Sequence, residues 1–437
     1  MAEKARPGDI VKFHLKDEII KGTLLPRSEI MDKKAGEKIK VIKLENGYNI
    51  GVSASRIKKT EIIKKHKPQE TKKVSKVSDK TLPKVLIISC GGTISSRIDY
   101  ITGGVYADYT AEDFLEMMPE LGNIADIDAI SLLTKMSEDF TSDDWKKISR
   151  TIEKNYAAYD GFVITQGTDT LHYSSAAVSF FLEDLNKPVV FTAAQRSIDR
   201  GSSDAFMNLV SAVKFASASS VPGVYVCMHA TLNDDFCHVH KGVKVRKMHS
   251  LRRDAFRSIN DDPVATIDYT DLTIEKKGDL PHKDDALPDK LELKDKFEDK
   301  VAFIYFHPNM DPSIIDFYLD KGYKGFVFAG TALGHISMNG PKSFKEHIDK
   351  LKDHGIPVVM TTQCLYGRVD PLVYSTLRYL SIEGEVIFAE DMLPEVAYVK
   401  LSWLLGHGFS KEAIRSMMLE NRRGEINSMV KVNHFLN

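Results

Sequence analysis

The chain has 437 residues, of which 43% are hydrophobic and 28% are charged, as in an ordinary globular protein of more than one domain. Its 60 basic and 61 acidic residues nearly balance, so overall charge does not favour nucleic acid or a membrane surface as a partner. The amino terminus lacks the apolar core of a signal peptide, and no apolar run is long enough to span a bilayer. The four cysteines form no CxxC motif or disulfide framework. We therefore expect a soluble cytoplasmic protein without membrane contact.

Residues 1–56 are expected to form a small β-barrel. Apolar runs with polar interruptions lie at 9–15, 19–25, 38–44 and 48–52. Asn46-Gly47, between the last two runs, is a strong hairpin signal. Four or five short strands in so short a segment are typical of a closed barrel. Such a barrel could bind nucleic acid or protein, or simply dock on a neighbouring domain, and the sequence leaves these roles open.

Two charged segments divide the rest of the chain. Residues 57–81 are rich in lysine and poor in apolar residues, which predicts a solvated linker, although a basic linker could also contact RNA phosphates. Residues 271–300 are dense in lysine, aspartate and glutamate and contain two prolines, which predicts a second linker.

Between the linkers, residues 82–270 alternate between strand and helix patterns, which predicts a larger α/β domain with a doubly wound parallel sheet. Buried strands are predicted at 85–88, 161–166, 188–192 and 224–228, and helices from 142, at 171–185 and at 204–216. Residues 301–437 repeat this pattern and predict a smaller α/β domain. Its strands are expected at 301–306, 325–329 and 356–361, and its helices at 313–321, 342–353 and 393–419, with a turn at 406–408.

Two glycine-and-hydroxyl loops, each directly after a buried strand, are candidates for the chemistry. The first is Gly91-Gly92-Thr93 and the second is Gly167-Thr168-Asp169. In open α/β sheets ligands bind beyond the carboxyl ends of the strands, where these loops begin. A threonine hydroxyl is a weak nucleophile unless a base or a cation activates it. The nearest candidate cations lie in the strand-like segment from Lys241 to Lys247, where alternation would place residues 241, 243, 245 and 247 on one face, but spacing alone leaves open whether the groups meet.

These motifs together resemble the bacterial-type L-asparaginase and glutaminase family. The matching residues are Gly91-Gly92-Thr93-Ile94, Gly167-Thr168-Asp169-Thr170 and Lys247, nine residues before Phe256-Arg-Ser258. The resemblance covers residues 82–437 and implies an active site at the carboxyl end of the first sheet. It also implies that Thr93 is the acylated nucleophile, which attacks a side-chain carboxamide and releases ammonia. Tyr100 matches a mobile-loop tyrosine that helps to activate that threonine.

The same resemblance assigns roles to five further residues. Thr168, Asp169 and Lys247 would form a second set, which activates the hydroxyl or the deacylating water and binds the substrate amino group. Ser137 and Glu138 begin a Ser-Glu-Asp segment that matches the family's Ser-Gln-Asp. The serine would hold the substrate carboxylate, whereas the glutamate departs from the usual glutamine, so its substrate contact is open.

Further features resemble one branch, the D subunits of archaeal glutamyl-tRNA(Gln) amidotransferases. They are the preceding barrel and the segments at 96–104 and 195–204. In that branch the D subunit hydrolyses glutamine or asparagine, and ammonia passes to a partner, the E subunit, which binds Glu-tRNA(Gln) and activates it with ATP. The resemblance implies a homodimer within a heterotetramer, no cofactor in this chain, and ATP and Mg on the partner. The sequence contains no GxxxxGK[ST] phosphate loop, in agreement with an ATP site elsewhere.

Other interpretations remain open. One is a self-sufficient asparaginase with an accessory barrel, and another is a catalytically silent RNA-binding or scaffold protein that uses the barrel and the lysine-rich linker. A Cys/His cluster within 227–240 could suggest zinc, but its spacing matches no standard site, so we expect no metal. The loop at 330–335 could line a pocket or an interface between protomers.

Overall fold

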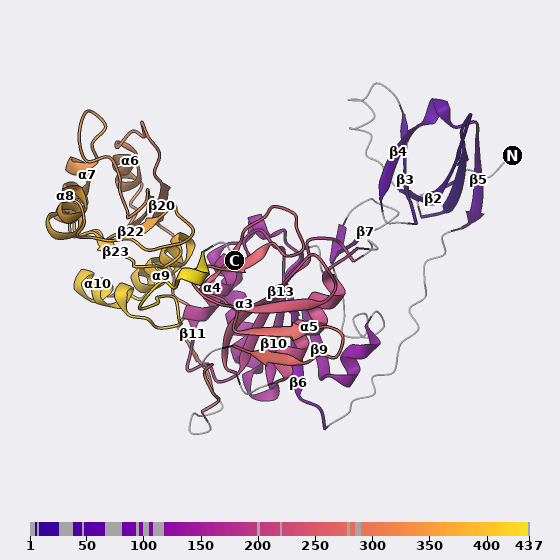
Figure 1. The fold of residues 1–437 in the computed structure, drawn as a ribbon, viewed down its shortest axis with the longest axis horizontal. Coiled ribbons are helices and arrows are strands. Elements are labelled where there is room, and N and C mark those ends of the chain that lie inside the picture. The colour runs from indigo at the N-terminus through magenta and orange to yellow at the C-terminus, as the bar shows by residue number, and fades with distance from the viewer. Residues whose placement is uncertain are drawn as a thin grey trace.

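The computed structural model describes residues 5–6, 8–25, 38–45, 48–65, 81–92, 96–98, 105–107, 118–198, 202–218, 221–277, 280–284 and 290–435. They form a small antiparallel β domain followed by two α/β domains (Figure 1). Among these residues, no helix combines the length and the apolarity that crossing a membrane requires. All four cysteines are free thiols, and only Cys364 is exposed.

The amino-terminal domain is a curled five-stranded antiparallel sheet in the order β4-β3-β2-β1-β5 (Figure 1). Its strands are β1 (Ile10–His14), β2 (Ile19–Leu25), β3 (Ile39–Lys43), β4 (Asn49–Ser53) and β5 (Lys59–Lys64). The sheet surrounds a core of its own in which Val11, Phe13 and Ile42 are at most 1% exposed. The predicted hairpin joins β3 to β4, and its Asn46-Gly47 turn lies outside the described residues.

The end of this domain lies later than the predicted boundary at residue 56. β5 pairs antiparallel with β1, so residues 59–64 complete the sheet and are not linker. Their lysines gave the strand a linker-like composition. Charged side chains are common on an edge strand because they discourage pairing with another chain, while Ile62 still packs on the core. Most of the remaining predicted linker, 66–80, lies outside the described residues.

The larger α/β domain contains an eight-stranded sheet in the order β18-β17-β14-β13-β12-β10-β6-β9. The strands are β6 (Lys84–Ser89), β9 (Asp126–Ser131), β10 (Gly161–Thr165), β12 (Pro188–Thr192), β13 (Gly223–His229), β14 (Phe236–Lys241), β17 (Ala265–Asp268) and β18 (Ile274–Lys276). From β9 to β13 the strands are parallel, as predicted. β14, β17 and β18 add an antiparallel edge that the sequence pattern did not predict.

The helices of this domain are α3 (Ser142–Asn155), α4 (Leu171–Phe181) and α5 (Ala205–Ser217). α3 begins at a capping box in which the side chains of Thr141 and Asp144 bond reciprocally to backbone amides. α4 is buried along almost its whole length and is shorter than the predicted helix at 171–185. It ends where β11 (Leu182–Glu183) pairs with β19 (Glu292–Leu293).

The smaller domain has four parallel strands in chain order: β20 (Val301–Tyr305), β21 (Gly325–Gly330), β22 (Val358–Thr362) and β23 (Ile387–Phe388). Its helices are α6 (Ile314–Asp320), α7 (Lys345–Asp353), α8 (Ser375–Arg378), α9 (Pro394–Gly406) and α10 (Lys411–Leu419). The predicted strands and helices are present, and α9 and α10 are separated at the predicted turn. The short β23 and α8 were not expected from the sequence.

The two α/β domains share a hydrophobic core. α4 of the first packs on α9 of the second, where the rings of Phe180 and Trp403 lie 5.8 Å apart. Parts of the predicted linker at 271–300 form strands, because β18 belongs to the eight-stranded sheet and β19 pairs with β11. The first domain is therefore held by its neighbour and is not loosely tethered to it.

The position of β5 predicts that a fragment of residues 1–65 folds alone and that a fragment of residues 1–56 does not. The shorter fragment leaves β1 as an unpaired edge and loses the contact of Ile62 with the core. Small sheets with few strands have little stability to spare. Urea unfolding followed by circular dichroism should show a cooperative transition for the longer fragment only. A cooperative transition in both would mean that β5 is dispensable.

Candidate active site

Three loops meet at the carboxyl ends of β6, β10 and β9. After β6 the chain passes through Gly91 and Gly92 with φ angles of 88° and 78°, which glycine adopts most readily. A Cβ atom on Gly92 would lie 2.3 Å from the amide nitrogen of Gly167, and one on Gly91 would lie 2.5 Å from the carbonyl oxygen of Lys135. Only glycines allow this backbone contact, which joins the three loops.

Thr93 and Tyr100 lie outside the described residues. The chain is described as far as Gly92 and again in β7 (Ser96–Ile98), which pairs antiparallel with β8 (Val105–Ala107). The roles expected of Thr93 and Tyr100 therefore stay predictions.

Thr168, Asp169 and Lys247 lie together although 78 residues separate the last two in the chain. The Nζ atom of Lys247 donates a hydrogen bond to Thr168 Oγ1 at 2.8 Å and lies 2.6 Å from Asp169 Oδ1. Thr168 Oγ1 is also 3.4 Å from Asp169 Oδ1. The Lys247 side chain is 10% exposed, whereas that of Asp169 is 64% exposed. A largely buried ammonium group thus contacts a hydroxyl and a carboxylate that is open to solvent.

Ser137 connects the loop after β9 to the loop after β10. It begins η4 (Ser137–Asp139) and is 3% exposed. Its Oγ accepts a hydrogen bond from the Asp169 amide at 3.2 Å, and its carbonyl oxygen accepts one from Thr170 Oγ1 at 2.6 Å. The Ser137 hydroxyl can still donate to a ligand. Glu138, the next residue, is exposed.

Lys247 comes from a short hairpin and not from the continuous strand suggested by the alternation at 241–247. β14 ends at Lys241, which pairs with Asp261 at 2.9 Å. A turn follows, closed by a hydrogen bond from the Lys244 amide to the Lys241 carbonyl. Lys247 then lies in β15 (Val245–Lys247), which pairs only with β16 (Phe256–Ser258). The expectation that residues 241 and 247 share one face of a strand is therefore wrong.

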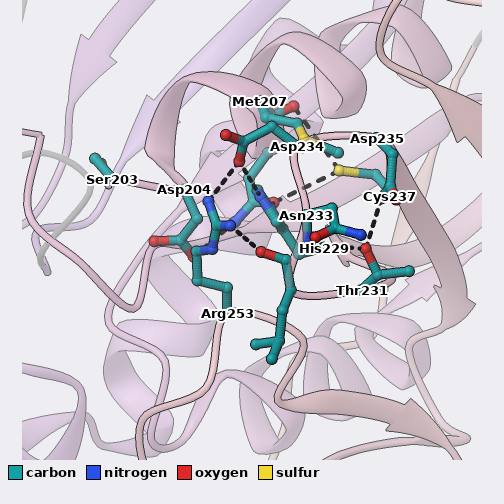
Figure 2. A network of polar contacts seen from close by, with 12 residues as sticks. Ser203, Asp204, Met207, His229, Thr231, Asn233, Asp234, Asp235, Cys237 and Arg253 are labelled. Carbon is teal, nitrogen blue, oxygen red and sulfur yellow. Dashed lines mark hydrogen bonds and ion pairs between the residues drawn. The ribbon is translucent and has the colours of Figure 1, made fainter. Parts of the chain in front are cut away.

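The tip of this hairpin is fixed to the turn after β13. Arg253 bonds to the Leu232 carbonyl and to Asp234. Figure 2 shows Arg253 beside Asp234. Nearby, a hydrogen bond from Arg252 lowers the pKa of Asp254 to about 2, so this carboxylate stays charged. These ion pairs hold the segment that follows Lys247.

The Cys/His cluster extends the same network into the sheet (Figure 2). His229 Nδ1 lies 2.6 Å from Asn208 Oδ1, and Asn208 Nδ2 donates to Asp204 Oδ2 at 3.2 Å. Cys227 and Cys237 are fully buried, and burial raises the pKa of the Cys227 thiol. Within the described ranges, no three His, Cys, Asp or Glu side chains are grouped so that they could hold a metal ion. The observed contacts give the cluster a role in joining β13 and β14 to α5.

A buried polar group that was not expected from the sequence lies behind Lys247. Glu395 Oε1, on α9, is 3.2 Å from Arg246 Nε and 3.6 Å from His172 Nε2. Burial, with the nearby positive charges of Arg246 and Lys247, lowers the pKa of His172 to about 3, so this imidazole is neutral near pH 7. Burial also raises the pKa of Glu395. His172 follows the second motif closely, but nothing in the sequence connects it with Glu395 on a helix of the other domain.

Comparisons with known proteins agree with this architecture. Three family models match: "GatD N-terminal domain" at residues 5–63, "Asparaginase, N-terminal" at 84–279 and "Glutaminase/Asparaginase C-terminal domain" at 300–418. Among solved structures, the thermostable L-asparaginase from Thermococcus kodakarensis aligns with a TM-score of 0.70 and 32% identity, covering 79% of this chain and 100% of its own. L-asparaginase I from Vibrio cholerae aligns with a TM-score of 0.68 and 27% identity, covering 79% and 99%.

Curated relatives match the chain from end to end. The D subunit of the glutamyl-tRNA(Gln) amidotransferase of Pyrococcus abyssi is 44% identical over 98% of this chain and 97% of its own length. The protein of the same name from Methanopyrus kandleri is 44% identical over 96% of this chain and 91% of its own.

The glycine contact predicts that Gly92→Ala destabilises the protein far more than Gly355→Ala. Both glycines have positive φ, 78° and 69°, so each alanine carries a backbone penalty of about 1–2 kcal/mol. Only at position 92 would the new methyl group also collide with backbone, since nothing lies within 4 Å of a Cβ at position 355. Urea unfolding of the two variants measures the difference. Equal losses would show that the loops can separate freely.

Proposed function

Because the chain belongs to the family of glutamyl-tRNA(Gln) amidotransferase D subunits, we propose that it releases ammonia from glutamine or asparagine for the amidation of Glu-tRNA(Gln) by a partner protein. The asparaginase domain makes it the amidohydrolase component of such an enzyme. The observation that carries the proposal is the group of Lys247, Thr168 and Asp169 at the carboxyl edge of the sheet, beside the glycine loop that leads into Thr93.

In the proposed reaction Thr93 Oγ1 attacks the carbonyl carbon of the substrate carboxamide. The carbon–nitrogen bond breaks, the nitrogen takes up a proton and leaves as ammonia, and an ester to Thr93 remains. Water then cleaves this ester and releases the free carboxylic acid. Gly92, the residue before Thr93 in the sequence, contacts Gly167 in the loop that carries Thr168.

The second set of residues would supply the proton transfers. Lys247 is hydrogen-bonded to Thr168, so a proton can pass between the lysine and a hydroxyl or water bound at that threonine. Asp169 Oδ1 lies 2.6 Å from Lys247 Nζ and keeps the ammonium group of the lysine in place. We propose that these three residues activate the Thr93 hydroxyl or the deacylating water, and that Tyr100 assists the first step.

Substrate binding would use the groups that face the open side of the site. The exposed carboxylate of Asp169 can accept hydrogen bonds from the substrate ammonium group. The hydroxyl of Ser137, which lies against the same loop, can donate to the substrate carboxylate. Glu138 follows Ser137 in the chain and is exposed, and we propose that it makes only a minor contact with the substrate.

We propose that the ATP-dependent half of the reaction takes place on the partner, the E subunit, which would carry ATP and Mg. The relatives are named as subunits of an amidotransferase, which implies a partner subunit for each of them. We further propose a homodimer of this chain within a heterotetramer, in the cytoplasm, with Glu-tRNA(Gln) bound mainly by the partner. The separate amino-terminal domain would then serve for docking.

The assignment of Thr93 as nucleophile predicts that Thr93→Ala separates two activities of the complex. Transamidation with glutamine as donor should fall by at least about a thousandfold, because no acyl-enzyme forms. Transamidation with added ammonium should stay near the wild-type rate, since ammonium bypasses this site. Formation of Gln-tRNA(Gln) is the measurement for both donors. Loss of both activities would instead make Thr93 a structural residue.

The proposed partnership predicts that ammonia release depends on the complex. The isolated chain should hydrolyse glutamine slowly, and addition of the partner and Glu-tRNA(Gln) should raise the rate at least about tenfold. Coupled detection of ammonia gives the rates. Full activity of the isolated chain, unchanged by partner and tRNA, would favour a self-sufficient asparaginase.

A further inference from the structure

We propose that the second α/β domain positions Lys247 in the active site, with Asp391 and Glu395 as the positioning residues. This inference rests on the proposed function, in which Lys247 takes part in the reaction. It assigns the second domain a role in the chemistry of its own chain, although Thr168, Asp169 and Lys247 all belong to the first domain.

A fully buried ion pair holds the base of the hairpin that carries Lys247. Lys244 Nζ lies 2.6 Å from Asp391 Oδ2, and neither side chain has any exposed surface. Lys244 also donates to the Asp391 carbonyl at 3.3 Å. An ammonium group so deeply buried is stable only beside its carboxylate, so the residue just before β15 is fixed to the second domain.

Side-chain alternation then directs Lys247. Arg246 and Lys247 are successive residues of β15, so their side chains point to opposite faces of the strand. Lys244 contacts Asp391 and Arg246 contacts Glu395 at 3.2 Å, both in the second domain. Lys247, on the other face, contacts Thr168.

The other strand of the hairpin is tied to the same anchor. Asn260, two residues after β16, is 2% exposed and donates to the Gly367 carbonyl at 2.9 Å. Its own carbonyl accepts a hydrogen bond from Asn427 Nδ2 at 2.6 Å. Asn427 donates two hydrogen bonds to the Asp391 carboxylate, one from its backbone amide at 2.9 Å and one from its side-chain Nδ2 at 3.0 Å. Asp391 therefore fixes both ends of the hairpin.

Glu395 also lies close to the helix that follows the Thr168 loop. It lies in the first turn of α9 and is 3.6 Å from His172, in the first turn of α4. α4 begins three residues after Thr168, and α4 and α9 pack along one another. One carboxylate thus lies between the strand that bears Lys247 and the helix behind Thr168. A displacement of about 1 Å between reacting groups can cost on the order of a hundredfold in rate.

The test compares Asp391→Asn and Glu395→Gln with Glu183→Gln in the full complex. Glu183 follows α4 at its far end and also joins the two domains, 2.9 Å from Arg423. Arg423 also donates to the Ser179 carbonyl at 2.7 Å, a bond that does not involve Glu183. α4 has 11 residues, so at about 1.5 Å per residue this control lies roughly 16 Å from Glu395.

We expect Asp391→Asn to lower kcat for ammonia release about ten- to a hundredfold, and Glu395→Gln several-fold, both with little change in KM. Glu183→Gln should leave kcat unchanged. Hydrogen exchange of the backbone amides in β15 and β16 gives a readout independent of activity, and it should quicken in the first two variants only. If Asp391→Asn does not fold, the milder Glu395→Gln variant decides.

Two results would overturn the inference. One is an unchanged kcat in folded Glu395→Gln and Asp391→Asn, and the other is an equal loss of kcat in Glu183→Gln. Failure of the proposed function looks different, because then the wild-type complex releases no ammonia, or Lys247→Met releases it at the wild-type rate.

Discussion

The close approach of two backbones at Gly92 and Gly167 is the constraint on which the site depends. Two parallel neighbouring strands, β6 and β10, end at the same edge of the sheet, but their loops would diverge if Gly92 carried a side chain, because it would collide with the backbone of Gly167. Side chains on Gly91 and Gly167 would collide with Lys135 and Ser137 of the loop after β9, so these glycines let that loop approach the same place. The backbone geometry therefore fixes the positions from which the hydroxyl groups and the carboxylate of the site extend, whatever rotamers their side chains adopt.

Electrostatics adds a second layer of order. Lys247 reaches the loops from a hairpin that is not part of the main sheet, and a two-stranded hairpin has little stability alone. Its tip is bound by the arginines and aspartates around Arg253, and its base by Lys244 and Asp391. The buried charges cost free energy to desolvate, and they restrict the hairpin to the few positions in which each charge meets its partner.

The sequence was sufficient to predict the motif loops and most of the strands and helices, because these depend on local patterns. Glycine, hydroxyl and carboxylate residues directly after a buried strand indicate a loop at the edge of the sheet wherever the chain goes next. Lys247 could be chosen only through the family resemblance, and the hairpin that holds it was mistaken for one strand because Val243 and Val245 alternate across the turn. The link between His172 and Glu395 depends on packing between domains, for which residue spacing contains no signal.

The shared core of the two α/β domains couples their unfolding. Phe180 of α4 and Trp403 of α9 belong to one hydrophobic cluster, so neither domain can lose its packing while the other keeps it. Heat or denaturant should then remove the active site and the bulk of the fold in a single cooperative step, without a partly active intermediate. The amino-terminal sheet has a separate core and can unfold in a transition of its own. A melting curve with two steps would then reflect separate unfolding of this sheet and of the two α/β domains, not gradual loss of the active site.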